Sequence, residues 1–364
     1  MPNLRIEILN IALSLACMAF IHRQIKEYGY RSDSIQERIG LFDALKGVCI
    51  IGVVFIHAAY LTPVSRDICR TLDFAVPFFF VSSGYLLSVR CRGAIALKGY
   101  YRKLFVRVLL VYLLFVIGTR IFKGEALAFK DILLDILLGR TNYNYYFIPL
   151  IVQFYILFPS MVRFRGKLDS PFVFCLIAFC SFFFYVCNHY IQRPYWNENP
   201  YYLVFIGRDC IYFCFGIFLS RYEIRKLRFA DCLPSCMIFL AGVAVLVLAT
   251  GEYILTFAYP FVAFLLALAG YNMLRAQPWL YPLENLGRYS LVIYLVHTSI
   301  QSTVVMKYLY NAKLPWKFEI LVVVGATVVL SYVFARIFMS VYQPAMLFFM
   351  PVKQLVAVEK KSRQ

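Results

Sequence analysis

The sequence predicts an all-α integral membrane protein, a polytopic bundle of about ten transmembrane helices. Of its 364 residues, 62% are hydrophobic and only 15% are charged, and the mean hydropathy is +0.71. Soluble domains are roughly 45–50% apolar and about 25% charged. Apolar runs close to the ~20 residues that span a bilayer recur along the chain, whereas the short alternating segments of a transmembrane β-barrel do not.

Apolar runs, taken in order, define the predicted elements. The ten predicted spans are residues 44–62, 72–90, 101–122, 145–163, 171–190, 202–220, 233–250, 253–274, 288–309 and 318–348. Between the third and fourth spans, "FKDILLDILLGR" has apolar residues at helical spacing, which predicts a short amphipathic helix at the surface.

Three regions follow from these spans. Residues 1–40 are predicted to form an N-terminal cytoplasmic or interfacial segment, 41–348 the transmembrane domain, and 349–364 a basic cytoplasmic tail. The first region contains an apolar stretch, residues 4–21, interrupted by Arg5 and Glu7. The sequence leaves open whether this stretch forms an additional span.

The net charge of +18 is explained by membrane topology rather than by nucleic-acid binding. Lys and Arg lie mainly in alternate connections between the spans, and these residues accumulate on the cytoplasmic side of membranes. We therefore expect a multi-pass protein of the bacterial inner (plasma) membrane with both termini cytoplasmic. The eleven Cys lie mostly within or beside apolar runs and lack zinc-type CxxC spacing, so we expect them to pack as small apolar residues.

The first span, "LFDALKGVCIIGVVFIHAAY", carries three ionisable residues. Asp43 and Lys46 stand three positions apart, the spacing of an ion pair on one helix face. His57 follows Lys46 by eleven positions, close to three helical turns, or about 16 Å along the same face. Such a polar stripe faces a bundle interior or a wet cavity rather than lipid, because charged groups in hydrocarbon cost about 2.5–3.5 kcal/mol each.

A plainer interpretation of these residues stays open. Asp43 is also typical of a helix start, and Lys46 of a base whose side chain extends to the membrane interface. His57 could be a packed histidine that bonds to a neighbouring helix. The shared spacing favours a site, in which Lys46 would meet a phosphorylated ligand and His57 would act as a general base.

The second and third spans add small and basic residues. In "FAVPFFFVSSGYLLSVRCR", we expect Pro77 to kink the helix, and Ser82 and Ser83 to form a close-packing patch or to contact substrate. The third span opens with the basic residues Arg102, Lys103 and Arg107. They either anchor the helix at the inner leaflet or bind the phosphates of an anionic cofactor.

Further polar residues stand inside two later spans. Gln153 and Tyr155 occur in "IPLIVQFYILFP", and a mid-span Gln usually bonds to another helix. His297 lies nine positions beyond Arg288, which again places a histidine near mid-membrane. Two histidines at that depth in separate spans exceed what packing requires, so His297 is a candidate site residue.

Together these motifs resemble the membrane-bound acyltransferase 3 family. The family pattern of an Asp, then Lys or Arg, then ten residues and a His is similar to Asp43, Lys46 and His57. The segments "FFFVSSGYLL", "QFYILFP" and "LGRYSLVIYLVH" resemble later family motifs in the same order, and the match runs from about residue 41 to 345. The "VP" before "FFF" resembles glycan and polysaccharide O-acetyltransferases. The family's acidic pair before the fourth-span Gln is replaced here by Ile151 and Val152.

The resemblance implies transfer of an acyl group, usually acetyl, from cytoplasmic acyl-CoA to a hydroxyl of a cell-surface or lipid-linked glycan. It implies that Lys46, Arg102, Lys103 and Arg107 meet the CoA phosphates, and that His57 is the base or a transient acyl carrier. Asp43 would hold Lys46 in place. No metal is implied. Candidate contacts to the acceptor or the oxyanion are Gln153, Tyr155, His297, Ser82 and Ser83.

Two other functions would also use a polar seam. A transporter or flippase for an acylated glycan or a small anion would need a cavity with a basic mouth. A sensor could keep the fold without catalysis, although the retained spacing of Lys46 and His57 speaks against it. Acyl transfer from acetyl-CoA distinguishes the enzyme from both.

Overall fold

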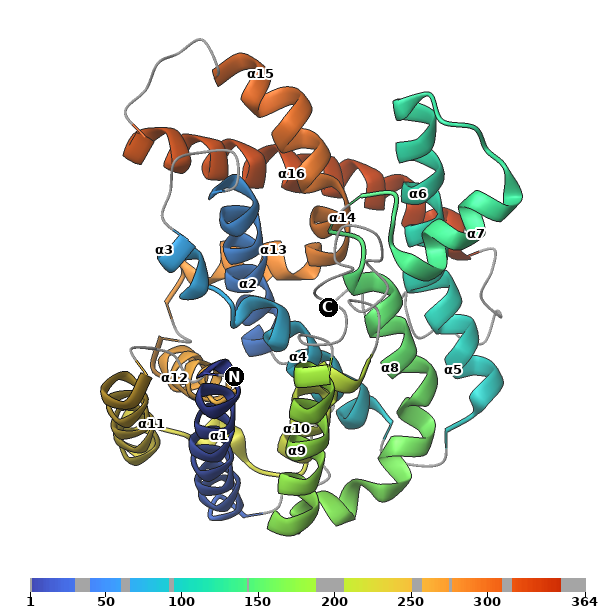
Figure 1. Ribbon diagram of the computed structural model, residues 1–364. Helices are drawn as coiled ribbons and strands as arrows, with labels where there is room; N and C mark the ends of the chain where they lie inside the picture. The colour runs from blue at the N-terminus through green and yellow to red at the C-terminus, as the bar shows by residue number, and fades with distance from the viewer. Residues whose placement is uncertain are drawn as a thin grey trace.

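The computed structural model describes residues 2–29, 40–59, 66–91, 95–142, 144–187, 206–250, 257–274, 277–309 and 316–347. This described part is a bundle of helices without a β-sheet (Figure 1). The all-α prediction is therefore confirmed. The predicted tail, residues 349–364, lies outside the described residues.

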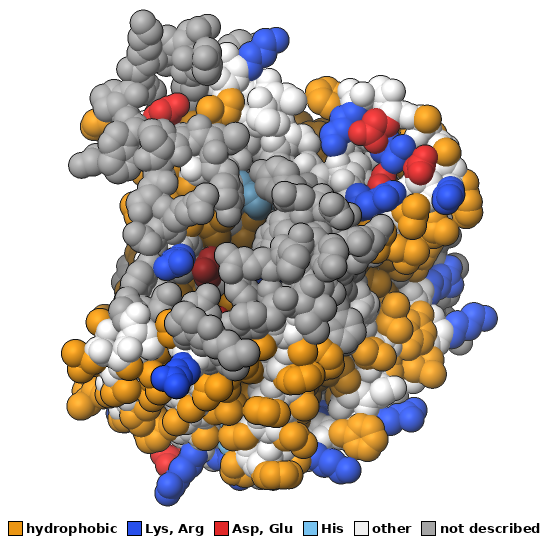
Figure 2. Space-filling model, in the orientation of Figure 1, with side chains coloured by type: hydrophobic (Ala, Val, Ile, Leu, Met, Phe, Trp, Pro, Cys, Tyr) orange, Lys and Arg blue, Asp and Glu red, His pale blue; other side chains and the backbone are white. Residues whose placement is uncertain are grey.

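Seven helical segments are long and apolar enough to cross a membrane: Arg5–Lys26, Gly40–Ala59, Ile68–Arg90, Leu97–Lys123, Phe147–Asp169, Phe229–Thr250 and Phe318–Met346. Three shorter apolar helices are Pro171–Cys187, Tyr259–Leu274 and Ser290–Val305. Many apolar side chains on these helices remain exposed, as expected where hydrocarbon is the solvent (Figure 2). The protein is thus a multi-pass membrane protein.

The elements in chain order agree closely with the predicted spans. The helices of the first half are α1 (Pro2–Lys26), α2 (Gly40–Ala59), α3 (Arg66–Arg70), α4 (Ala75–Arg90), α5 (Leu97–Leu104), α6 (Leu110–Lys123), α7 (Phe129–Leu138), α8 (Phe147–Met161) and α9 (Pro171–Cys187). Those of the second half are α10 (Cys210–Leu219), α11 (Phe229–Thr250), α12 (Tyr259–Leu274), α13 (Leu280–Arg288), α14 (Ser290–Ile300), α15 (Met306–Leu309) and α16 (Trp316–Leu347). The amphipathic helix predicted before the fourth span is α7.

One expectation about these elements was wrong, and another is tested only in part. Pro77 does not kink a span, because it lies in the first turn of α4, where a missing N–H breaks no helical bond. Of the predicted span at 202–220, residues 202–205 lie outside the described residues, and the part that is described forms a short 3₁₀ turn, Ile206–Asp209, and the ten-residue α10. α10 therefore rises only about 15 Å, half the thickness of the hydrocarbon core.

The N-terminal segment forms α1, which has the length and hydropathy of a membrane span. It packs beside α9 and α11 (Figure 1). His22 of α1 donates from Nε2 to the Leu168 carbonyl at 2.8 Å, and its ring stacks on Phe218 with centroids 4.4 Å apart. Gln24 accepts a hydrogen bond from Ser235 of α11 at 2.5 Å. These contacts make α1 part of the bundle.

Glycine lets two pairs of helices approach at backbone distance. A Cβ at Gly84 of α4 would overlap the carbonyl oxygen of Phe213, and one at Gly216 of α10 would overlap that of Val81. In the same way, a Cβ at Gly47 of α2 would overlap the Leu283 carbonyl of α13. Such small-residue crossings are the usual means by which membrane helices pack closely. They fix α2, which carries the polar stripe, against α13.

Candidate active site

The first turns of α2 hold an acid and an amine against α13. Lys46 Nζ lies 3.0 Å from Asp43 Oδ1, so the ion pair predicted from their spacing is present. The Asp43 side chain is 5% exposed and that of Lys46 is 20% exposed. Arg288, at the end of α13, places Nε 3.9 Å from Asp43 Oδ2. The two Asp43 carboxylate oxygens therefore each lie near a cation. One is Lys46, which the sequence predicted, and the other is Arg288, which it did not.

The other end of α2 holds two histidines. The rings of His57 and His297 lie 5.1 Å apart between centroids and are tilted by 38°. His57 is half-buried, whereas His297 and His22 are fully buried, so His57 is the described histidine with exposed surface. Figure 2 shows a histidine side chain in a hollow in the middle of the face drawn. The two histidines predicted at mid-membrane depth thus come together, one on α2 and one on α14.

Hydrogen bonding fixes the tautomer of His297. Its Nδ1 lies 2.8 Å from the Tyr294 carbonyl oxygen and 3.2 Å from that of Ile293. Because a carbonyl oxygen only accepts, Nδ1 carries the hydrogen, and Nε2 of the neutral ring presents its lone pair. That Nε2 is buried and has no hydrogen-bond partner among the described residues. His297 therefore offers a fixed proton acceptor inside the bundle.

A loop before α8 holds α14 in this position. Asn144 Nδ2 donates to the Tyr294 carbonyl at 2.8 Å, and the Tyr145 hydroxyl donates to the Leu295 carbonyl at 3.0 Å. Thr298 donates to Asn144 Oδ1 at 3.2 Å. Bonds of this kind on both sides of His297 fix the rotation of α14, which keeps the imidazole directed at α2.

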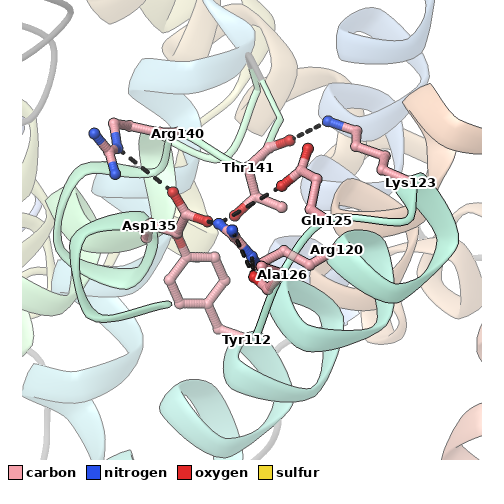
Figure 3. Close-up of polar contacts among 8 residues, drawn as sticks. All are labelled: Tyr112, Arg120, Lys123, Glu125, Ala126, Asp135, Arg140 and Thr141. Carbon is pink, nitrogen blue, oxygen red and sulfur yellow. Dashed lines mark hydrogen bonds and ion pairs between the residues drawn. The ribbon is translucent and has the colours of Figure 1, made fainter. Parts of the chain in front are cut away.

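The loop is in turn held by a buried ionic network between α6 and α7 (Figure 3). Arg120 donates to the Asp135 carboxylate and, from Nη2, to the Ala126 carbonyl at 2.8 Å. Asp135 also pairs with Arg140 at 3.4 Å, and Tyr112 donates to the Asp135 carbonyl at 3.0 Å. Asp135 thus ties α6, α7 and the start of the loop together.

Asp135→Ala is therefore expected to destabilise the protein and to reduce its activity indirectly. The change removes the buried carboxylate that bonds Arg120, which is 8% exposed, and leaves it only the longer 3.6 Å pair with the more exposed Glu125. We expect the thermal midpoint of the purified protein to fall by several degrees. Asp131→Ala removes a half-buried acid from the same helix and serves as the control. Equal midpoints for the two variants would contradict a structural role for the network.

A second polar pair links α4 and α8. The Tyr155 hydroxyl donates to Ser83 Oγ at 3.0 Å, which joins two residues predicted to contact substrate. Tyr100 of α5 donates to the Tyr155 carbonyl at 2.7 Å. Ser82, 1% exposed, has a hydroxyl without a hydrogen-bond partner among the described residues. Gln153, two positions before Tyr155 on α8, is half-buried.

Basic residues gather beside this pair. Arg90, at the end of α4, lies close enough to Tyr155 and to Arg107 to act on both electrostatically. Arg90 and Lys103 both act in this way on Cys91. We call Arg90, Lys103 and Arg107 the basic cluster. Arg107 stands in a π-helical turn, Phe105–Leu109, a feature often found at functional sites.

The structure therefore distributes the predicted residues over three places: the Asp43–Lys46 pair, the two histidines, and the Ser83–Tyr155 pair with its basic cluster. Phe42, beside Asp43, stacks on Tyr85 of α4 at 4.2 Å, so the first place adjoins α4 one turn from Ser82. Arg102 is exposed on α5. Sequence reasoning missed three members of these surroundings: Arg90, Asn144 and Arg288. Arg288 alone carried a usable signal, because it stands in the segment "LGRYSLVIYLVH" that resembles a family motif.

The bundle and its polar interior define a multi-pass membrane protein with ionisable groups placed for chemistry rather than for lipid contact. A family model described as an acyltransferase domain matches residues 39–336. The chain belongs to this acyltransferase 3 family and is a membrane acyltransferase. Searches of curated proteins and of solved structures find no match to it.

Proposed function

We propose that the protein transfers an acyl group, most simply acetyl, from acyl-CoA to a hydroxyl of a cell-surface or lipid-linked glycan. The observation that carries this proposal is the contact between His57 and His297 inside the bundle. Two neutral imidazoles at that depth, one of them with a fixed lone pair, supply the proton acceptor that hydroxyl attack on a thioester requires.

The reaction needs one proton transfer in each direction. The acceptor hydroxyl oxygen attacks the thioester carbonyl carbon while His57 takes its proton. The tetrahedral intermediate then expels the CoA sulfur, and the imidazolium returns the proton to that sulfur. In the alternative route, a nitrogen of His57 attacks the thioester carbonyl carbon and the carbon–sulfur bond breaks, so CoA leaves as the thiolate. The acceptor hydroxyl oxygen then attacks the acyl-imidazole, the carbon–nitrogen bond breaks, and the hydroxyl proton goes to the CoA thiolate. His297, whose ring lies beside that of His57, assists in holding the acceptor or the proton.

The donor is proposed to enter past the cations. CoA carries several phosphate charges, and the basic cluster with Lys46 offers ammonium and guanidinium groups suited to them. Asp43 holds Lys46 by their 3.0 Å ion pair. Ser82, Ser83, Gln153 and Tyr155 are proposed to line the path of the acyl arm. The proposal uses acyl-CoA as the donor substrate and no metal.

We place the protein in the bacterial inner membrane. The bias of Lys and Arg supports a cytoplasmic position for both termini. A crossing by α1 would reverse this for the N-terminus, because it adds one span. Cysteine labelling at residue 2 and at residue 352 from outside intact cells separates the two topologies.

Purified protein supplied with radiolabelled acetyl-CoA tests the function. We expect label to appear on surface polysaccharide taken from cells that lack this gene. Release of free CoA should accompany the transfer in equal amount. A protein that moves glycan or CoA across proteoliposomes without breaking the thioester would be a transporter, and that result overturns the proposal.

Lys46→Ala is expected to raise the KM for acetyl-CoA by about tenfold and to change the acceptor KM little, since one charge-assisted contact is worth roughly 1.5–3 kcal/mol. Lys46→Arg should retain most of the affinity. Lys307→Ala removes an exposed cation beyond His297 and serves as the control. An unchanged acetyl-CoA KM in Lys46→Ala would make Lys46 a membrane anchor only.

A further inference from the structure

Gln301 is a fully buried polar residue whose side-chain amide is unsatisfied within the described part of the chain. Its side chain is 0% exposed, and neither the amide nitrogen nor the amide oxygen has a hydrogen-bond partner among the described residues. Burying an amide without partners costs roughly 1–3 kcal/mol on protein scales. An apolar leucine would fill the same space without that cost. We therefore expect the amide to bond a ligand that is bound during the reaction.

The position of Gln301 directs it toward the histidines. It follows His297 by four positions, so the two side chains lie on one face of the α14 helix and its continuation. Val305, four positions further on, belongs to the buried cluster that contains Val54 and Ala58 of α2. His297 contacts His57 of α2 as well. Gln301 thus lies between His297, which contacts His57 of α2, and Val305, which belongs to a buried cluster formed with residues of α2 and α16.

The backbone at Gln301 is also unusual. Gln301–Val305 forms a π-helical turn, in which the Met306 N–H bonds to the Gln301 carbonyl instead of to the next carbonyl along. Such turns widen a helix locally and recur at functional sites. Here the π turn begins at the residue with the unsatisfied amide. Two independent features, one of the backbone and one of the side chain, therefore mark the same position.

The chemistry of the unsatisfied atoms identifies the missing group. Gln301 offers both a donor and an acceptor, and His297 Nε2, one turn away, offers an acceptor. A thioester carbonyl or a phosphate only accepts, so either would leave the two acceptors unmet. A sugar hydroxyl both donates and accepts. Adjacent hydroxyls on one ring would satisfy all three atoms.

We propose that Gln301 and His297 form a hydroxyl-binding subsite for the acceptor glycan, next to the half-buried His57. Gln301 holds a hydroxyl next to the one that is acylated, so it positions the acceptor and does not transfer the proton. This inference rests on the proposed acyltransferase function and extends it by naming where the acceptor binds. The donor phosphates bind elsewhere, at Lys46 and the basic cluster.

The test compares Gln301→Leu with the wild type, both purified, with acetyl-CoA as donor and polysaccharide fragments from cells lacking the gene as acceptor. We expect kcat/KM for the acceptor to fall at least tenfold, because sites that bond a hydroxyl discriminate strongly. The KM for acetyl-CoA and the slow hydrolysis of acetyl-CoA without acceptor should stay within about twofold. The thermal midpoint should hold or rise, because the leucine removes an unsatisfied amide.

Ser302→Ala is the matched control, since Ser302 lies in the same π turn, is exposed, and donates to the Thr298 carbonyl at 2.9 Å. It should leave all constants unchanged. An unaltered acceptor kcat/KM in Gln301→Leu, or a lowered thermal midpoint, overturns the inference while the acyltransferase function stands. A wild type that neither hydrolyses nor transfers acetyl from acetyl-CoA overturns the proposed function and this inference with it. If Gln301→Leu does not accumulate, Gln301→Asn retracts the amide by one methylene and should raise the acceptor KM selectively.

Discussion

His57→Ala should lower acyl transfer by about 10²- to 10⁴-fold, the range that a positioned general base contributes. If His57 instead carries the acyl group, the loss would be complete and no rescue by added acceptor would occur. The protein should still insert into the membrane and keep its thermal midpoint, because His57 is only half-buried and its ring lies beside that of His297. Mass analysis of surface polysaccharide and assay of the purified variant measure the two effects.

A neighbouring residue separates chemistry from packing in this experiment. Ile56 is also half-buried on α2, and Ile56→Ala removes a larger apolar group from the same turn. We expect Ile56→Ala to retain activity within a few-fold. Near-normal acylation by His57→Ala would remove this histidine from the mechanism, and His297 would then be the base to test.

Gly287→Ala is expected to produce the largest loss of stability of any single methyl group added to the bundle. A Cβ at Gly287 would overlap the carbonyl oxygen of Asp43, so α13 must move away from α2. Forced overpacking costs about 1–3 kcal/mol, and here the obstacle is backbone, which yields less than a side chain. The displacement also shifts the Asp43–Lys46 pair, so the KM for acetyl-CoA should rise.

The control variant, Gly118→Ala, is expected to change the stability in the opposite direction. A Cβ at Gly118 of α6 would meet nothing within 4 Å. Gly118→Ala should therefore be neutral or stabilising by up to about 1 kcal/mol, the difference in helix propensity. Denaturation of both variants in the same detergent measures the contrast. Similar midpoints for Gly287→Ala and Gly118→Ala would show that the α2–α13 crossing is not as close as described.

Much of the fold follows from local sequence. Each predicted span overlaps a helix, because an apolar run near bilayer length has one stable conformation in hydrocarbon, where backbone groups must bond internally. The surface helix α7 was also predicted from its period. Pro77 was misjudged because its effect depends on where the helix begins, and that start is set by the turn after α3.

The site was predictable residue by residue but not as an arrangement. The spacing of Asp43 and Lys46 fixes their ion pair, because both stand on one helix. The contact of His57 with His297 joins residues 240 positions apart, and no local pattern contains it. Arg288 reaches Asp43 only because Gly287 lets α13 approach α2 at backbone distance. From the sequence, Arg90 is an ordinary charge at the inner leaflet. The packing of α4 on α8 brings it close to Tyr155.

The sequence by itself determined that the protein lies in a membrane. It also determined where most of its apolar helices fall along the chain, and that a polar stripe runs along α2. These are consequences of composition and helical period, which act within a single segment. Only the tertiary structure decided which polar groups meet, which tautomer His297 adopts, and that Gln301 has no hydrogen-bond partner among the residues that the structure describes. Those outcomes depend on contacts between segments that are far apart in the sequence, and the pattern of a single helix does not predict such contacts.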